Sequence, residues 1–138
     1  MNRVVITGMG AITPLGNTVT EFWDGIKNGK NGIAAITNFD ASETGISVAG
    51  EVKDFDATKY MDRKEYKRMD LFSQYAVAAS AQAVEQSGID MEKIDADRFG
   101  VTIGSGVGGF ITMESGIIKM HEKGPKRVPP MFVPMAIG

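Results

Sequence analysis

Two kinds of hydrophobic pattern recur along this chain. Residues 3–7 and 99–103 are short runs rich in β-branched side chains, and glycines follow each run. Continuous apolar runs of this length are typical of buried strands, and the glycines after them mark turns. Between the two runs, apolar residues recur at helical spacing. Strands that alternate with helices in this way predict an α/β fold.

Periodicity and end signals predict three helices. The first begins at Thr18, which has capping-box spacing to Glu21, and it ends before Gly29, a residue type suited to the position after a helix. The second and strongest covers residues 62–87, and the third covers residues 111–122. The apolar stripe expected to bury the first helix comprises Val19, Phe22, Trp23 and Ile26.

Small side chains fill one face of the predicted helix 62–87. Gly88 ends this helix, and its buried stripe is expected to comprise Met69, Phe72, Ala76, Ala79 and Ala83. A stripe so rich in alanine lets another backbone approach closely. The apolar, proline-rich stretch 129–138 is an unusual end for a complete domain and predicts a chain that stops within its fold.

Composition and charge narrow the choice of function. The chain has 138 residues, with 15 basic and 17 acidic side chains and a net charge of −2. No overall field draws it towards nucleic acid or membrane, and no apolar run approaches the roughly 20 residues of a membrane helix. The first residues lack the features of a signal peptide, so we expect a cytoplasmic protein. With no cysteine, the chain has no disulfide and no thiol nucleophile.

Glycines 104 to 109 match the pattern G-x-G-x-x-G between a predicted strand and a predicted helix. That is the context of a dinucleotide-binding loop. Against this interpretation, a proline-rich loop follows the helix where a second strand with an acidic residue is required. We favour glycines that bring the backbone close to a ligand or a partner chain. No cofactor is predicted, and no acidic cluster has the spacing of a metal site.

A basic cluster, Arg63, Lys64, Lys67 and Arg68, opens the predicted helix 62–87. At this helix end the positive charges oppose the macrodipole, which favours an acidic partner. The alternative is a solvated face balanced by Asp62, Glu65 and Asp70. Lys123, Lys126 and Arg127 form a second basic group with the same two interpretations. The lone His121 is expected at the surface near a helix end.

Several segments together resemble the β-ketoacyl-acyl-carrier-protein synthases, a family of condensing enzymes. They occur in the family's order and cover almost the whole chain. The motifs are Arg3-Val4-Val5-Ile6-Thr7-Gly8-Met9-Gly10, Thr13-Pro14-Leu15-Gly16-Asn17, Phe22-Trp23, Val52-Lys53-Asp54-Phe55, Arg63-Lys64-Glu65, Arg68-Met69-Asp70, Gly104-Ser105-Gly106-Val107-Gly108-Gly109 and Gly124-Pro125-Lys126-Arg127-Val128.

The resemblance implies a thiolase-like fold, two similar α/β halves in a five-layer αβαβα core, assembled as a homodimer. Residues 1–138 would form a partial N-terminal domain with most of the first half. The family transfers an acyl chain to a cysteine and condenses it with malonyl-carrier protein. Its cysteine and two histidines lie beyond the matched region, so no catalytic residue is carried over and this chain alone is expected to be inactive.

Supporting roles are implied at single positions. The resemblance places five residues against the acidic face of acyl carrier protein: Lys64, Lys67, Arg68, Lys126 and Arg127. Gly106 and Val107 match positions that line the acyl tunnel, and Phe132 matches an aromatic that reaches across the dimer interface. Where isoleucine is common in the family, the smaller Val107 implies a roomier tunnel. Met131 stands where an aromatic is frequent.

Three functions remain open from the sequence. The first is the amino-terminal part of a synthase that elongates acyl chains. The second is a non-catalytic module that binds carrier protein or dimerises. The third is a nucleotide-binding domain built on glycines 104 to 109.

Overall fold

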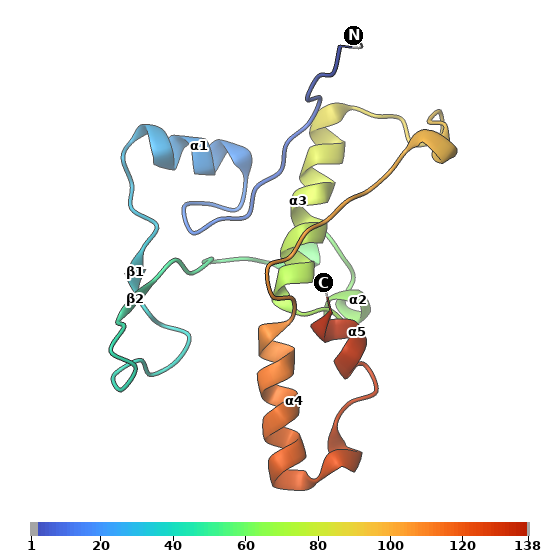
Figure 1. Cartoon of the computed structure of the whole chain (residues 1–138). Helices are drawn as coiled ribbons and strands as arrows, with labels where there is room; N and C mark the ends of the chain where they lie inside the picture. The colour runs from blue at the N-terminus through green and yellow to red at the C-terminus, as the bar shows by residue number, and fades with distance from the viewer. Residues whose placement is uncertain (1–2, 138) are drawn as a thin grey trace. The chain divides into compact units, whose positions relative to one another are not determined.

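The computed structural model describes residues 3–137, so Met1, Asn2 and Gly138 of the predicted domain lie outside the described residues. The helices and strands are labelled in Figure 1. In chain order they are α1 (Val19–Lys27), β1 (Ala34–Ala35), β2 (Val48–Ala49), α2 (Arg63–Tyr66), α3 (Leu71–Ser87), α4 (Phe110–Lys123) and α5 (Phe132–Ala136), with 3₁₀ helices η1 (Ala57–Lys59), η2 (Ala96–Arg98) and η3 (Pro125–Arg127). In the described part, no helix combines the length and the apolar character needed to cross a membrane.

The chain divides into two compact units. The first comprises Met1–Asp56 and Ala79–Gly88, and the second comprises Ala57–Ala78 and Ile89–Gly138. α1, β1 and β2 therefore belong to the first unit, whereas α2, α4 and α5 belong to the second. α3 contributes residues to both.

In the first unit, the N-terminal segment packs directly against the backbone of α3. A Cβ added to Gly10 would lie 2.6 Å from the carbonyl carbon of Ala79, and one added to Gly8 would lie 2.9 Å from the Ser87 nitrogen. Only glycine fits at such distances. The prediction that the alanine-rich helix lets another backbone approach closely is confirmed, and the approaching element is an extended segment.

Two glutamines of α3 bind the same N-terminal segment. The Met9 amide donates to Gln86 Oε1 at 2.7 Å, and the Ala11 amide donates to Gln82 Oε1 at 3.1 Å. Gln82 also donates from Nε2 to the Asn17 carbonyl at 2.7 Å. Because Gln82 and Gln86 are four residues apart, they project from one face of the helix. Side chains thus satisfy backbone groups that a neighbouring strand would otherwise bind.

The strands predicted at residues 3–7 and 99–103 do not form in the described residues. Val4 is 91% exposed, Ile6 is 84% exposed and Val101 is 73% exposed, so their predicted burial is wrong here. A strand needs hydrogen bonds from a neighbour, and no segment within residues 3–137 pairs with either run. The sheet that does form in this part is the antiparallel pair β1–β2, with Ala34 opposite Ala49 and Ala35 opposite Val48.

The signals at both ends of α1 are confirmed. The Thr18 hydroxyl accepts from the Glu21 amide at 3.2 Å, and Gly29 has φ +62° just after the helix. The Glu21 carboxylate, however, accepts from the Asn17 amide at 2.8 Å rather than from Thr18. Burial of the apolar stripe is wrong for Trp23 and Ile26, which are 56% and 45% exposed.

The single helix predicted over residues 62–87 is two helices. α2 ends at Tyr66 and α3 begins at Leu71. The Gln74 side chain lies across the break and donates from Nε2 to the carbonyls of Tyr66 at 3.1 Å and Met69 at 3.0 Å. A side chain thereby satisfies carbonyls that a continuous helix would bind. Gly88 follows α3 at φ +64°, as predicted. Ala78 is fully buried instead of the predicted stripe, whose alanines remain partly exposed.

Replacing Gly10 tests the close packing on α3. We expect Gly10→Ala to lower the free energy of unfolding by about 1–3 kcal/mol, because the new methyl group overlaps the Ala79 backbone. Gly100→Ala is the matched control, since no atom lies within 4 Å of its Cβ position. Urea unfolding measures both. Equal unfolding midpoints for the two variants would show that the N-terminal segment does not pack there.

Candidate functional site

A cavity of about 290 Å³ opens in the second unit. It is lined by the connection after α2, by one face of α4 and by α5 with the loop before it. The lining residues are Lys67, Arg68, Thr112, Ser115, Gly116, Lys119, Pro129, Met131, Phe132 and Met135. Basic side chains thus meet an apolar floor, and no acidic residue lines the cavity.

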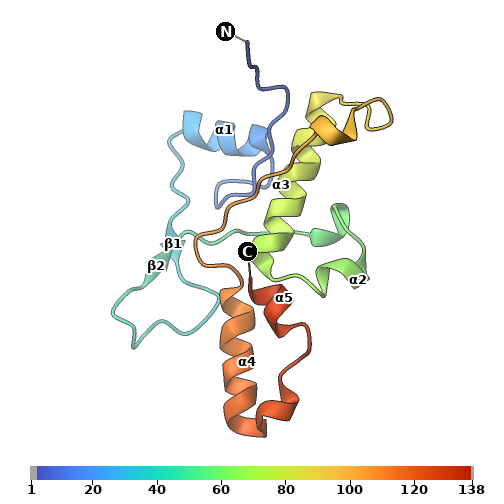
Figure 2. The same cartoon turned by 45° about the vertical axis from the view of Figure 1, so that its right-hand side comes forward.

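The floor of this cavity depends on contact between α4 and α5, which lie side by side in both views of the ribbon (Figures 1 and 2). Gly116 is buried, and the Phe132 ring occupies the space where a Cβ at position 116 would stand. Phe132 therefore packs on its own chain here. Any larger residue at position 116 would displace the ring and open the floor.

A buried carboxylate holds the start of α4. Asp70 is 6% exposed, and its Oδ2 accepts from the Thr112 amide at 2.7 Å. The residue before α4, Gly109, has no side chain to cap the helix, so Asp70 from a distant segment serves that purpose. The interpretation of Asp70 as a solvated balancing charge is wrong. The sequence does not reveal the capping role of Asp70, since an aspartate beside a basic cluster is typical of an exposed surface.

One glycine of the glycine-rich stretch, Gly109, packs closely against its own chain. A Cβ on Gly109 would lie 2.9 Å from Asp70 Oδ2 and 3.0 Å from the Ala136 Cα. The Gly109 amide donates to the Ala136 carbonyl at 2.8 Å. Gly104 and Gly106 have no atom within 4 Å of their Cβ positions. Within residues 3–137 no strand follows α4, so the strand–helix–strand unit of a dinucleotide site is absent there.

Of the predicted tunnel residues, one lines this cavity. Phe132 lines the cavity, whereas Gly106 and Val107 do not. Val107 is 66% exposed. Ser105 Oγ accepts from the Gly108 amide at 2.9 Å and folds this stretch back on itself.

The predicted docking residues are partly brought together. Lys67 and Arg68 line the cavity, while Lys64 stands in the first turn of α2, and Lys126 and Arg127 form η3. A complete capping box fixes the start of α2, because Asp62 Oδ1 accepts from the Glu65 amide and Glu65 Oε2 accepts from the Asp62 amide. This confirms that pair of end signals.

The helix break also corrects the electrostatic argument. Lys67 is the C-cap residue of α2, so its charge lies at a helix end that favours cations. Opposition to the macrodipole would require one continuous helix over residues 62–87, which the chain does not form. Lys64, Lys67 and Arg68 likewise cannot share one face of a helix that ends at Tyr66.

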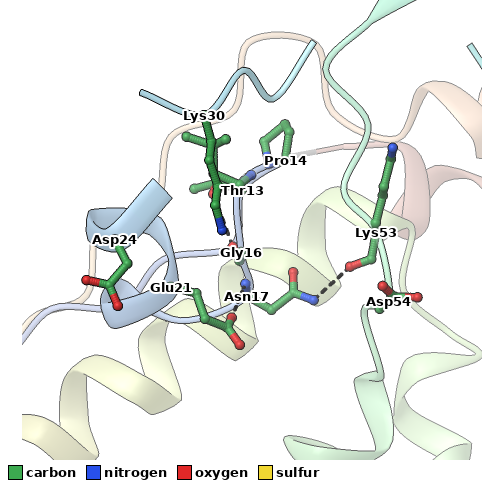
Figure 3. Close-up of a pocket in the computed structure, with 10 residues that line it drawn as sticks. Thr13, Pro14, Gly16, Asn17, Glu21, Asp24, Lys30, Lys53 and Asp54 are labelled. Atoms are coloured by element: carbon green, nitrogen blue, oxygen red, sulfur yellow. Dashed lines mark hydrogen bonds between the residues drawn. The ribbon is translucent and has the colours of Figure 1, made fainter. Parts of the chain in front are cut away.

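The first unit contains a cavity of about 450 Å³ around Asn17 (Figure 3). Asn17 donates from Nδ2 to the Lys53 carbonyl at 2.8 Å, and its Oδ1 is buried without a hydrogen bond in the described part. Glu21, Asp24, Asp54, Lys30 and Lys53 give the lining mixed charge. No histidine, serine or cysteine lines it.

Other titratable groups add no reactive centre to either cavity. His121 is exposed in the last turn of α4, as predicted. Burial raises the pKa of Tyr75. Hydrogen bonds lower the pKa of three carboxyl groups: Asp40 through Ser42, Glu51 through Thr37, and Asp90 through Lys93. None of these four titratable residues lines either cavity. Across residues 3–137 no three His, Asp or Glu side chains are grouped to hold a metal ion.

A family model described as "Beta-ketoacyl synthase, N-terminal domain" matches residues 1–137. The chain therefore belongs to the β-ketoacyl synthase family. It is 50% identical to a 3-oxoacyl-[acyl-carrier-protein] synthase 2 of Synechocystis sp. over 98% of this chain and 32% of the relative. It is 48% identical to the enzyme of the same name from Vibrio harveyi, with the same coverage. The chain thus spans about a third of the length of these relatives.

Solved ketosynthases share the fold. The ishigamide ketosynthase/chain length factor matches with a TM-score of 0.86 and 28% identity, over 96% of this chain and 33% of that one. A type II polyketide ketosynthase solved in complex with its acyl-carrier protein matches with a TM-score of 0.80 and 28% identity, over 99% of this chain and 35% of that one. These matches confirm the predicted thiolase-like α/β fold for the part that this chain covers.

Substitution of Asp70 tests the junction at the start of α4. We expect Asp70→Ala to lower the free energy of unfolding by about 1.5–3 kcal/mol, because the Thr112 amide loses a charged acceptor. Asp70→Asn keeps an acceptor oxygen and should lose less. Asp97→Ala, which removes an exposed carboxylate in the same unit, is the control. Hydrogen exchange at Thr112 gives a local measurement, and unchanged exchange in Asp70→Ala would contradict the capping role.

Proposed function

We propose that these residues are the amino-terminal part of a 3-oxoacyl-acyl-carrier-protein synthase of fatty acid synthesis. The observation that carries this proposal is 50% identity to such an enzyme over 98% of the chain but only 32% of the relative. The synthase is an acyltransferase that elongates acyl chains. A cytoplasmic location and a homodimeric assembly are part of the same proposal.

In the proposed reaction, a cysteine thiolate takes the acyl group from acyl carrier protein by thioester exchange. Malonyl-carrier protein then loses CO₂, and the resulting carbanion attacks the acyl-enzyme and releases the cysteine. The negative charge that develops on the reacting carbonyl needs preorganised donors. Because this chain has no cysteine, the nucleophile belongs to the remaining two-thirds of the synthase.

The exposed apolar runs support a longer protein. Residues such as Val4, Ile6 and Val101 are mostly exposed, and apolar β-branched runs of this kind form central strands when neighbours are present. In the proposed synthase, segments outside this chain pair with both runs and cover them. Without those segments the runs are an aggregation hazard.

In the proposed synthase, this chain contributes a docking surface for acyl carrier protein and part of the wall of the acyl tunnel. The basic surface, defined as Lys64, Lys67, Arg68, Lys126 and Arg127, would meet the acidic face of the carrier protein. Support comes from the similar ketosynthase solved with its acyl-carrier protein and from the exposure of all five residues. Gly106, Val107 and Phe132 would line the acyl tunnel. Both Gly106 and Val107 are open for other segments to cover.

Charge reversal tests the docking role. In the full-length synthase, Lys64→Glu/Lys67→Glu should weaken binding of acyl carrier protein about tenfold or more at low salt, because two attractive pairs become repulsive. The loss should shrink as salt rises, since exposed charges are screened beyond about 10 Å at 0.1 M. Titration calorimetry at two salt concentrations measures this.

The matched control is Lys30→Glu/Lys93→Glu, which makes the same charge change at two exposed lysines that are not part of the basic surface. Equal weakening by the control pair would show that only net charge matters. Full affinity in Lys64→Glu/Lys67→Glu would remove the docking role from these residues.

Enlarging Val107 tests the tunnel role. In the full-length synthase, Val107→Phe should shorten the longest acyl chain accepted, because the larger ring projects from the wall into the tunnel and takes up space for the chain. Val107→Ile should cause a smaller shift in the same direction. Product chain lengths measured by mass spectrometry decide the matter, and an unchanged distribution in Val107→Phe would contradict the assignment.

A further inference from the structure

The cavity in the second unit adds a basic residue that lies far along the sequence from the docking cluster. Four residues of α4 line it: Thr112, Ser115, Gly116 and Lys119. Their spacing of i, i+3, i+4 and i+7 places them on one face of the helix. Lys119 therefore shares a cavity with Lys67 and Arg68, although no sequence motif connects them.

Three cations meet in this cavity without an acid. None of Lys67, Arg68 and Lys119 belongs to an ion pair within residues 3–137, and no Asp or Glu lines the cavity. Like charges that line one cavity repel each other. An anionic surface that binds over the cavity removes that repulsion. Charge complementarity thus favours an acidic partner.

We propose that Lys119 is a further docking residue, which forms an ion pair with the acidic face of acyl carrier protein together with Lys67 and Arg68. This inference rests on the proposed function and extends the basic surface onto α4. The Thr112 hydroxyl borders the same face and offers a donor beside the charge. The Ser115 hydroxyl donates to the Thr112 carbonyl at 3.2 Å. Lys119 would mainly raise the association rate and orient the carrier protein.

The experiment uses the full-length synthase and measures carrier-protein affinity by surface plasmon resonance at low and high salt. Lys119→Glu should weaken binding about five- to tenfold at low salt, with most of the change in the association rate. The variant Lys119→Arg should bind the carrier protein with nearly the affinity of the parent, since it keeps the positive charge. In the double variant Lys67→Glu/Lys119→Glu the losses should not add, because neighbouring charges couple.

Two controls separate docking from other causes. Lys93→Glu makes the same charge change in an exposed surface pair with Asp90, whose loss costs little, and it should bind like the parent. The unfolding midpoint of Lys119→Glu should match that of the parent, which shows that the fold is intact.

The outcomes distinguish this inference from the proposed function. Weak binding by Lys67→Glu with unchanged binding by Lys119→Glu would overturn the role of Lys119 and leave the docking surface in place. Unchanged binding in both variants would overturn the docking surface and this extension together. Loss in both, with rescue by Lys119→Arg and no loss in Lys93→Glu, would support it.

Discussion

A buried carboxylate, that of Asp70, connects the segments that line the cavity of the second unit. Asp70 follows directly after Lys67, Arg68 and Met69, and it accepts from the Thr112 amide at the start of α4. At the same point Gly109 donates to the carbonyl of Ala136 at the end of α5. The basic connection, the last glycine of the glycine-rich stretch and α5 therefore meet at one junction. An unpaired amide at a helix start and a buried, unpaired carboxylate would each destabilise the fold. Here the Thr112 amide and the Asp70 carboxylate satisfy each other. The cavity depends on this junction, because it sets where α4 stands beside Arg68 and Phe132.

In the first unit, helix α3 holds the extended N-terminal segment, which pairs with no strand of the described residues. Gly8 and Gly10 bring the segment against the backbone of α3, and Gln82 and Gln86 satisfy two of its amides. The residues before it have no such support, and Val4 and Ile6 are exposed. Residues 3–137 thus share the fold of larger ketosynthases although the sheet they form is the short β1–β2 pair. Helix contacts within the first unit position the segment, and no strand of the described residues pairs with it.

Local signals were predictable from the sequence because their physics is local. The capping pair of Asp62 and Glu65, the positive φ of Gly29 and Gly88, and the extent of α4 all depend on residues a few positions apart. The two strands were predicted from an apolar pattern that describes preference, but a strand forms only with a partner. The break after Tyr66 was missed because Gln74 looks like an ordinary helix residue until its side chain is seen to bind the carbonyls there. Lys67 and Arg68 were visible in the sequence as part of the basic cluster 63–68, whereas Lys119 joins their cavity only through the packing of α4.

The central claim is that these residues dock and position a substrate whose chemistry occurs elsewhere in a longer synthase. The most direct test is to incubate the native protein with acyl-loaded carrier protein and to map the acyl group by peptide mass spectrometry. We expect a cysteine outside residues 1–138 to gain the mass of the acyl group, and every peptide of residues 1–138 to remain unmodified. An acyl group carried by a side chain within residues 1–138 would contradict it.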